Sequence, residues 1–171
     1  MNYSQGTLGL DGLPLEMNYK EYRQEKSEKS KEYQDFICRW FAQNYGLVIS
    51  VFSSRKYQKE IGESIQGFEI KYDMLFEETG NLYIECGEKA MPRPGEYYPS
   101  GINANDNSWL YFIGNYHTLY IFSKKQLRII RDRKLYKCFV LNNKTKTSEG
   151  YLLTIEQADK FCIEKINFDN A

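Results

Sequence analysis

The chain has 171 residues, the length of a single domain, and this is enough to bury a hydrophobic core without disulfides or metal ions. Hydrophobic residues make up 42% and charged residues 27%, as is ordinary for a globular protein, and the formal net charge is zero. No apolar run approaches the length of a membrane span, and residues 1–14 lack the basic start and apolar stretch of a signal peptide. We therefore expect a cytoplasmic protein without a membrane segment.

The cysteine and histidine content excludes several kinds of catalytic site. The only histidine, His117, lies in a polar turn, so a His-rich zinc site is impossible and Ser-His-Asp or Cys-His catalysis would have to use this residue. The four cysteines are far apart and form no CxxC pair, so we interpret them as reduced thiols. They are Cys38, Cys86, Cys138 and Cys162.

The N-terminal part of the chain predicts an arm, a helix and a strand. Residues 1–29 are expected to form a flexible, charged arm, and residues 30–171 a single domain. Ser30 is a suitable N-cap for the helix, and Gly46 a suitable end. The helix has apolar side chains at spacings of three and four, namely Tyr33, Phe36, Ile37, Trp40, Phe41 and Tyr45. Residues 47–52 are short, apolar and β-branched, which predicts a buried strand.

Two segments that alternate between polar and apolar residues follow. Residues 68–73 and residues 81–87 are each predicted to form a strand with one apolar and one polar face. The polar face of the first strand carries Glu69, Lys71 and Asp73, and that of the second carries Tyr83, Glu85 and Gly87. Because the connection between them is short, we expect the two strands to be antiparallel neighbours.

The second half of the chain predicts six further elements. In chain order they are a β-hairpin of residues 109–113 and 118–122, a helix at 124–132 capped by Ser123, strands at 138–141 and 150–153, and a last helix capped by Thr154. Helices and strands in this order predict a mixed α/β (α+β) fold, with a central mixed β-sheet flanked by helices.

Charge is unevenly distributed along the chain. Residues 60–88 contain eight acidic residues against one lysine, and residues 124–146 contain nine basic residues against one aspartate. An acidic pocket attracts metal cations and a basic flank attracts polyanions, so this combination favours a protein that handles phosphodiesters. The alternative is that the two charged segments are solvated faces that pair with each other across the fold.

Asp73 and Glu85 are the residues to which this pattern assigns chemistry. Two carboxylates on one face of a sheet offer the hard oxygen ligands that Mg²⁺ or Mn²⁺ prefers. Such an ion polarises a phosphodiester and lowers the pKa of a bound water. The same side chains would also be explained by a solvated sheet face with ion pairs between its strands.

The segments Gly67-Phe-Glu-Ile-Lys-Tyr-Asp73 and Gly80-Asn-Leu-Tyr-Ile-Glu-Cys-Gly-Glu-Lys89 resemble the motif of the restriction-endonuclease-like nucleases, the PD-(D/E)XK superfamily. The preceding helix and strand fit the element order of that fold, and the resemblance covers residues 30–123. It implies a restriction-endonuclease-like core in which Asp73 and Glu85 bind the metal ion. It also implies a lysine two positions after the glutamate that orients or activates the attacking water.

The chain departs from this motif at the lysine, because the residue two positions after Glu85 is Gly87. Lys89 would lie on the same strand face two residues further on, about 6–7 Å away, and a long side chain can span part of that distance across a glycine. Lys71, on the face of the neighbouring strand that carries Asp73, is a second source of an ammonium group. The third reading is that the lysine is lost and that the fold is a binding scaffold.

Three functions remain open at this level. The first is a Mg²⁺- or Mn²⁺-dependent DNA endonuclease whose basic helix binds the phosphate backbone. The second is a catalytically inactive nuclease-fold protein of a phage or mobile element that binds nucleic acid or a host defence complex, as anti-CRISPR proteins do. The third is an interaction domain without nucleic acid. If the chain is an endonuclease, a homodimer formed through the aromatic hairpin is a further expectation. The predicted phosphate contacts are Lys124, Lys125, Arg128, Arg131 and Arg133.

Overall fold

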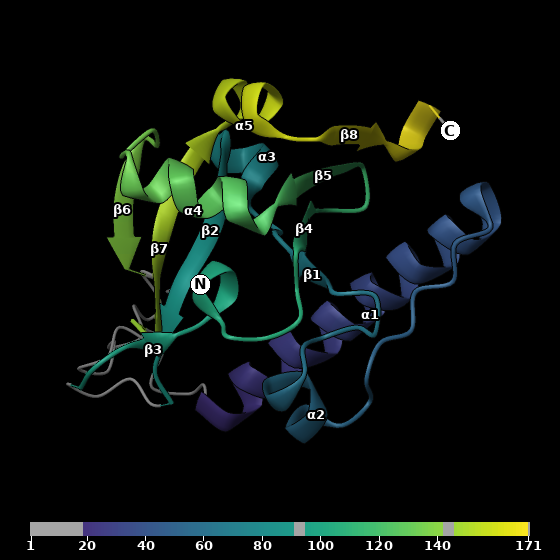
Figure 1. Cartoon of the computed structure of the whole chain (residues 1–171), viewed down its shortest axis with the longest axis horizontal. Coiled ribbons are helices and arrows are strands. Elements are labelled where there is room, and N and C mark those ends of the chain that lie inside the picture. The colour runs from purple at the N-terminus through teal and green to yellow at the C-terminus, as the bar shows by residue number, and fades with distance from the viewer. Residues whose placement is uncertain (1–18, 91–94, 142–145, 171) are drawn as a thin grey trace, which may run out of the picture.

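The computed structural model of the chain describes residues 19–90, 95–141 and 146–170. Within these ranges the chain forms two four-stranded sheets with helices on their outer and inner faces (Figure 1). The mixed α and β composition predicted from the sequence is therefore confirmed. The strands form two separate sheets, however, and not the single central sheet that we expected.

The first sheet joins segments from the middle and the end of the chain. Its strands, in spatial order, are β1 (Phe68–Tyr72), β4 (Leu110–Gly114), β5 (Thr118–Ser123) and β8 (Glu164–Asn167). β1 runs parallel to β4, and the other pairs are antiparallel. The predicted hairpin is confirmed as β4 and β5, whereas β8 was not predicted.

The second sheet is antiparallel throughout. Its strands, in spatial order, are β3 (Tyr98–Pro99), β2 (Asn81–Glu88), β7 (Ser148–Thr154) and β6 (Cys138–Leu141). The predicted strands at 138–141 and 150–153 are confirmed as β6 and as part of β7. The expected pairing of residues 68–73 with residues 81–87 is wrong, because β1 pairs with β4, and β2 with β3 and β7.

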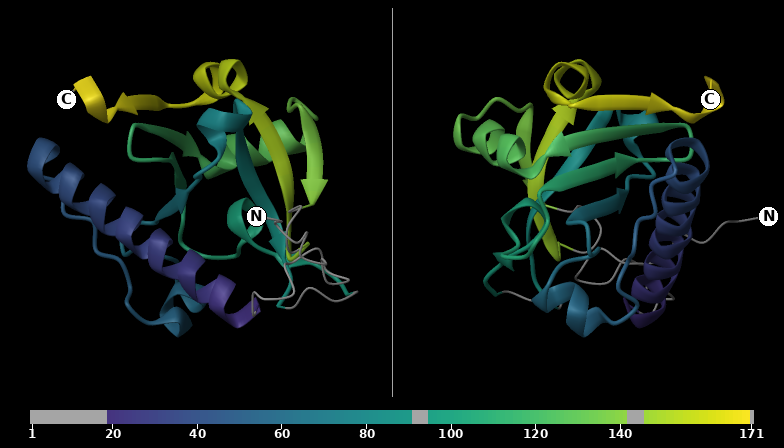
Figure 2. Two further views of the ribbon diagram at one scale, coloured as in Figure 1. Left: turned by 180° about the vertical axis from the view of Figure 1, so that it is seen from behind. Right: turned by 45° about the vertical axis from the view of Figure 1, so that its right-hand side comes forward.

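Helices cover the sheets on both sides. They are α1 (Tyr19–Tyr45), α2 (Arg55–Glu60), α3 (Phe76–Thr79), α4 (Lys124–Asp132) and α5 (Ile155–Phe161), with short 3₁₀ turns η1 (Gly101–Asn103) and η2 (Phe168–Asn170). α1 crosses the outer side of the first sheet (Figure 2). The caps predicted for α4 and α5 are confirmed, since Ser123 accepts a hydrogen bond from the Gln126 amide and Thr154 forms a capping box with Gln157.

The first helix begins earlier than its predicted N-cap. α1 starts at Tyr19, and Ser30 lies within it, where its hydroxyl donates to the carbonyl of Lys26 at 2.9 Å. The helical segment therefore includes residues 19–29 of the predicted arm, while residues 1–18 lie outside the described residues. The helix ends as predicted at Gly46, whose φ of 63° is left-handed.

The predicted buried strand at 47–52 does not form. Only Val51 makes a bridge, to Ser64, and Val48 is exposed. Beside this bridge the side chain of Gln66 takes the place of a partner strand, because its amide accepts from the Ser50 amide and donates to the Val48 carbonyl. A side chain can satisfy two backbone groups but cannot extend a ladder, so the segment stays irregular.

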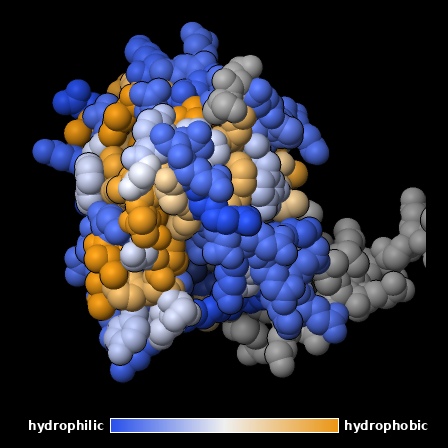
Figure 3. All heavy atoms as spheres, turned by 90° about the vertical axis from the view of Figure 1, so that its right-hand side faces the viewer, coloured by the Kyte–Doolittle hydropathy of each residue, from blue (hydrophilic) through white to orange (hydrophobic). Residues whose placement is uncertain are grey.

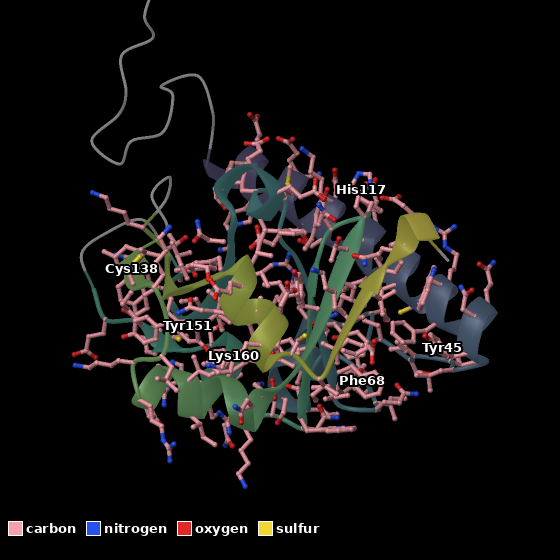
Figure 4. The ribbon with its side chains drawn as sticks, turned by 90° about the horizontal axis from the view of Figure 1, so that it is seen from above. Tyr45, Phe68, His117, Cys138, Tyr151 and Lys160 are labelled. Atoms are coloured by element: carbon pink, nitrogen blue, oxygen red, sulfur yellow. The ribbon has the colours of Figure 1, made fainter. Side chains whose placement is uncertain are left out.

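Two hydrophobic cores lie on opposite sides of the first sheet. One fills the space between the two sheets and includes Ile84, Tyr111, Leu127 and Tyr151. The other lies under α1 and includes Tyr33, Ile37, Phe41, Phe68 and Phe112. Figure 4 shows this division, with Tyr151 on one side of the molecule and Phe68 and Tyr45 on the other. The alternation in β1 has this consequence: Phe68 and Ile70 point to α1, so Glu69 and Lys71 point to the space between the sheets.

Part of the surface is hydrophobic. On the face shown in Figure 3, hydrophobic side chains gather in an elongated patch beside strongly hydrophilic ones. The exposed large hydrophobic residues include Tyr45, Val48, Ile65, Trp109 and Ile163. Among the helices of the described ranges, none combines the length and the apolar character needed to cross a membrane.

Gly101 is predicted to be essential for the contact between η1 and β2. Its φ is 54°, and a Cβ there would collide with the backbone of Glu85. Gly80 has a similar φ of 64°, but a Cβ there meets open space. We expect Gly80→Ala to lower the free energy of unfolding by about 1–2 kcal/mol from the left-handed backbone alone. Gly101→Ala should cost a further 1–3 kcal/mol, roughly, because of the collision.

Urea denaturation of the two variants measures this difference. The two substitutions share the conformational cost and differ in the available space, so Gly80→Ala is the control. Equal losses of stability in both variants would show that η1 does not press on β2 at Glu85.

Candidate active site

The two sheets meet at β2, along the part of its edge that β3 does not cover. The Asp73 carboxylate, just after β1, accepts a hydrogen bond from the Tyr83 backbone amide at 2.9 Å and another from the Leu75 amide at 3.1 Å. Burial raises the pKa of Asp73, and these two amides oppose that shift. Asp73 therefore joins the first sheet to the second, and we call this contact region the seam.

Tyr111 forms a second link across the seam. Its side chain is buried between the sheets, and its hydroxyl makes a hydrogen bond with the backbone of Glu85. Burial, and then the neighbouring carboxylate of Glu69, hold the pKa of Tyr111 well above its usual range. The phenol is therefore neutral, and its role at the seam is that of a hydrogen-bonding group.

Glu85 is held in a cluster of hydroxyl groups. Its Oε1 accepts from the Ser100 hydroxyl at 2.6 Å, and its Oε2 accepts from the Ser148 hydroxyl at 3.1 Å. The Ser148 Oγ also lies 2.7 Å from the Tyr83 hydroxyl. Two hydroxyl donors from separate parts of the chain therefore hold the Glu85 carboxylate in place at the seam.

Lys71 faces the same region from the first sheet. Its Nζ lies 3.0 Å from Glu69 Oε1, and 35% of its side chain is exposed. Partial burial lowers the pKa of the ammonium, but the carboxylates of Glu69 and Glu85 outweigh this effect and hold the pKa well above its usual range. Lys71 is therefore a permanent hydrogen-bond donor and positive charge beside Glu85.

Lys124 lies in the interior and not on the predicted phosphate-binding surface. Its side chain is 1% exposed, and its Nζ lies 3.1 Å from Glu69 Oε2 and 2.9 Å from Asp106 Oδ1. It also donates to the Ser108 hydroxyl at 2.7 Å. The expectation that Lys124 contacts phosphate is thus wrong, because its charge is already paired inside the fold.

The other four basic residues of the predicted surface remain at least partly accessible. Lys125 and Arg133 are exposed, whereas Arg128 and Arg131 are half-buried. Arg128 donates to the carbonyl of Ile102 at 2.5 Å, and Arg131 binds the side chains of Asn103 and Asp132. The two half-buried arginines therefore attach α4 to η1, the turn that follows Ser100.

Lys89 points away from Glu85. The β2–β7 register shifts between Glu85 and Gly87, so Cys86 is an extra, unpaired residue and forms a β-bulge. Beyond a bulge the two faces of a strand are exchanged, and Lys89 accordingly lies over the ring of Tyr97 at 4.9 Å. The expectation that Lys89 shares the face of Glu85 is wrong for this reason.

Gly87, at the motif position of the lysine, is on the opposite face as well. A Cβ at this position would lie 3.0 Å from Glu149 Oε1 and 3.3 Å from the Tyr97 Cβ. The glycine therefore fits the crowded face on which Lys89 lies. Lys71 is left as the lysine that faces Glu85.

The donors present are compatible with a hydrated divalent ion. Among the described residues, no group of three or more His, Cys, Asp and Glu side chains is placed to hold a metal ion. Mg²⁺ is usually bound through one or two carboxylates and retains several waters. Asp73 binds the Tyr83 amide, and Glu85 follows Tyr83 by two residues, about 6–7 Å along the strand. Asp73 and Glu85 thus both lie along this edge of β2.

Several residues of the seam were not found from the sequence as site residues. They are Glu69, Ser100, Asp106, Tyr111 and Ser148. Glu69 alternates with Lys71, which was a usable signal. Lys124 gave a second usable signal. It precedes the buried residues Leu127 and Ile130 by three and six positions, and this helical spacing indicates the inner face of α4. The serines carry no local signal.

Comparison with known proteins does not assign the chain to a family. No protein-family model matches it, and neither a curated protein sequence nor a solved structure does so. The function must therefore be inferred from the seam itself.

The buried ion pairs of Lys124 give a stability prediction. Lys124→Met leaves Glu69 and Asp106 without this partner in a buried setting, so we expect the free energy of unfolding to fall by about 3–5 kcal/mol. Lys125→Met, at the next and exposed position of the same helix, should change it by no more than about 0.5 kcal/mol. Thermal or urea unfolding of the two variants makes the comparison, and similar stabilities would contradict the paired interior position of Lys124.

Glu63 makes stability depend on pH. Burial raises the pKa of Glu63 to about 8, with Lys71 opposing the shift. The folded protein therefore binds more protons than the unfolded chain between the usual carboxyl range and pH 8. We expect the contribution of Glu63 to stability to fall as pH rises through this window and to level off above it.

Glu63→Gln isolates this effect, because the amide keeps the size of the side chain and cannot ionise. Urea unfolding at several pH values should show a flatter pH profile for the variant than for the wild type. Parallel profiles would mean that Glu63 titrates alike in the folded and unfolded states.

Proposed function

We propose that the chain is a metal-dependent DNA nuclease with its active centre at the seam. The observation that carries this proposal is that the charge of Glu85, on the second sheet, acts on Lys71 of the first and raises its pKa, where the motif position Gly87 supplies no lysine. Asp73 reaches the same edge of β2. Two carboxylates and one ammonium, the set of groups that such hydrolysis needs, thus come together from separate sheets.

Each group has a distinct role in the proposed reaction. Asp73 and Glu85 would hold Mg²⁺ or Mn²⁺, which, when bound, polarises the phosphodiester and lowers the pKa of its water. Lys71 is protonated at neutral pH, so it acts by hydrogen bonding and charge and does not accept the proton of the water. It orients the attacking water and stabilises the negative charge that develops on the phosphate.

The exposed side of α4 is the proposed contact for the DNA backbone. Lys125 and Arg133 reach solvent, and η1 connects this helix to Ser100 and hence to Glu85. Contacts of this kind give affinity without sequence preference and weaken as salt concentration rises. A homodimer, which would let two centres cut opposite strands, stays a prediction.

A second candidate is a catalytically inactive nuclease-fold protein that binds nucleic acid or a host defence complex. It is favoured by the protein partners of both carboxylates, since both oxygens of Asp73 accept backbone amides and both oxygens of Glu85 accept hydroxyls. In this reading the groups stabilise the seam and perform no chemistry. The cleavage experiment separates the two candidates.

Cleavage of plasmid and oligonucleotide DNA in Mg²⁺ or Mn²⁺ tests the nuclease. We expect Glu85→Gln and Asp73→Asn to abolish metal-dependent cutting, because each removes one ligand charge while keeping the shape of the side chain. Lys71→Met should lower the rate by about 10²–10³-fold through loss of charge stabilisation. Lys89→Met is the matched control and should cut at the wild-type rate, since Lys89 points to the opposite face.

The result is decisive in either direction. If the wild-type protein does not cut DNA, or if Glu85→Gln still cuts it, the nuclease proposal is wrong and the inactive nuclease-fold protein is favoured. A loss in Lys89→Met with full activity in Lys71→Met would move the lysine role to Lys89. Unfolding curves of the variants show whether a lost activity reflects a lost fold.

A further inference from the structure

An exposed tyrosine lies beside the seam on the face that carries Glu85. Tyr98 pairs with Glu88 across β3 and β2, and Glu88 pairs with Ser148 across β2 and β7. Directly paired residues share a face, and Ser148 binds Glu85 on this face. The Tyr98 side chain is 67% exposed, and within the described residues its ring joins no aromatic stack. A flat, accessible ring is therefore available next to the proposed centre.

The segment that carries Tyr98 is clamped onto β2. The Ser100 amide donates to the Cys86 carbonyl at 3.3 Å, and the Ser100 hydroxyl donates to Glu85. Gly101 presses on the backbone of Glu85 so closely that a side chain there would not fit. Tyr98 thus has a fixed position relative to Glu85, and a ligand that binds its ring has little chain entropy to remove.

Tyr98 lies within reach of a ligand that also contacts Glu85. Ser100 follows Tyr98 by two residues and has extended backbone angles, so the two side chains are separated by about 6–7 Å. A base on the Tyr98 ring would therefore lie within a few nucleotides of a phosphate at Glu85.

The surroundings of Tyr98 select an uncharged ring as its ligand. Glu88, on the same rung of the ladder, is exposed and repels a phosphate group. A nucleobase has a π-face that stacks on an aromatic side chain whatever the sequence. In duplex DNA the faces of each base are covered by its neighbours, so only an unpaired base can stack on the ring.

We propose that Tyr98 is a stacking platform for an unpaired nucleobase and that the substrate bound at the seam is single-stranded DNA. The inference rests on the proposed function for its choice of DNA as the ligand. Tyr98 is a binding residue in this proposal and takes no part in the hydrolysis.

Binding is measured with the full chain by fluorescence anisotropy of a labelled oligothymidine and of a labelled duplex, in EDTA, where metal-dependent cutting does not occur. Tyr98→Ala weakens binding of the single strand by about 5- to 100-fold and leaves duplex binding unchanged. Tyr98→Phe keeps wild-type binding, because phenylalanine presents the same ring face. Glu88→Gln, the control on the same rung, does not weaken the binding, because it removes a charge that repels phosphate.

Three outcomes would overturn the stacking role. The first is an equal loss of single-strand affinity in Tyr98→Ala and Tyr98→Phe, which would indicate a contact with the hydroxyl and not with the ring. The second is wild-type affinity in Tyr98→Ala. The third is binding of single-stranded RNA without binding of single-stranded DNA. Cleavage assays in Mg²⁺ separate this inference from the nuclease proposal. Wild-type protein that binds single strands through Tyr98 but does not cut refutes only the nuclease. Cutting of single-stranded DNA at concentrations below saturation that Tyr98→Ala leaves unchanged refutes only the stacking.

Discussion

The part of β2 that β3 does not cover is the constraint on which the arrangement of the molecule depends. β3 pairs only with Gly87 and Glu88, so the rest of that edge of β2 has backbone amides without a strand partner, and burying them without hydrogen bonds is costly. Here no further strand covers the edge at Tyr83 and Glu85. A carboxylate and a phenol from the first sheet take its place, through Asp73 and Tyr111. Two sheets are thereby held together by side chains, and the polar groups of both meet at this junction.

This junction also explains why charged residues lie in the interior. Glu69 and Lys71 point between the sheets because the apolar residues that alternate with them on β1 pack against α1. Once Glu69 is buried, it needs cationic partners, and Lys71 and Lys124 supply them from opposite sides. The side chain of Lys71 stays about one-third exposed, whereas Lys124 is enclosed. One lysine of the network thus reaches solvent next to Glu85, while the other holds α4 against β1.

The parts of the fold that were predicted correctly depend on short-range patterns. The hairpin of β4 and β5, the caps Ser123 and Thr154, and the end of α1 at Gly46 are each encoded within a few residues. The parts that were missed depend on distant partners. The parallel pairing of β1 with β4 joins segments separated by about forty residues in the printed sequence, and nothing local in β1 distinguishes β4 from β2 as its neighbour.

The candidate site was predicted in part for the same reason. Alternation correctly placed Glu69 and Lys71 on one face, because the period of a strand is local. It failed for Lys89, because the bulge at Cys86 arises from the pairing with β7 and interrupts the alternation. Ser100 and Ser148 approach Glu85 from separate strands and loops, so only the folded chain brings them together.

The bulge at Cys86 has a consequence for the way motifs are counted. Position along a sequence and position along a ladder differ by one after an unpaired residue. In the chain, the second residue after Glu85 is Gly87, whereas the next rung on the same face is occupied by Glu88. A sequence motif with a fixed gap between its acidic and basic positions therefore pairs Glu85 with Gly87, although the two residues lie on opposite faces of β2. Geometric equivalence across a bulged strand has to be established rung by rung.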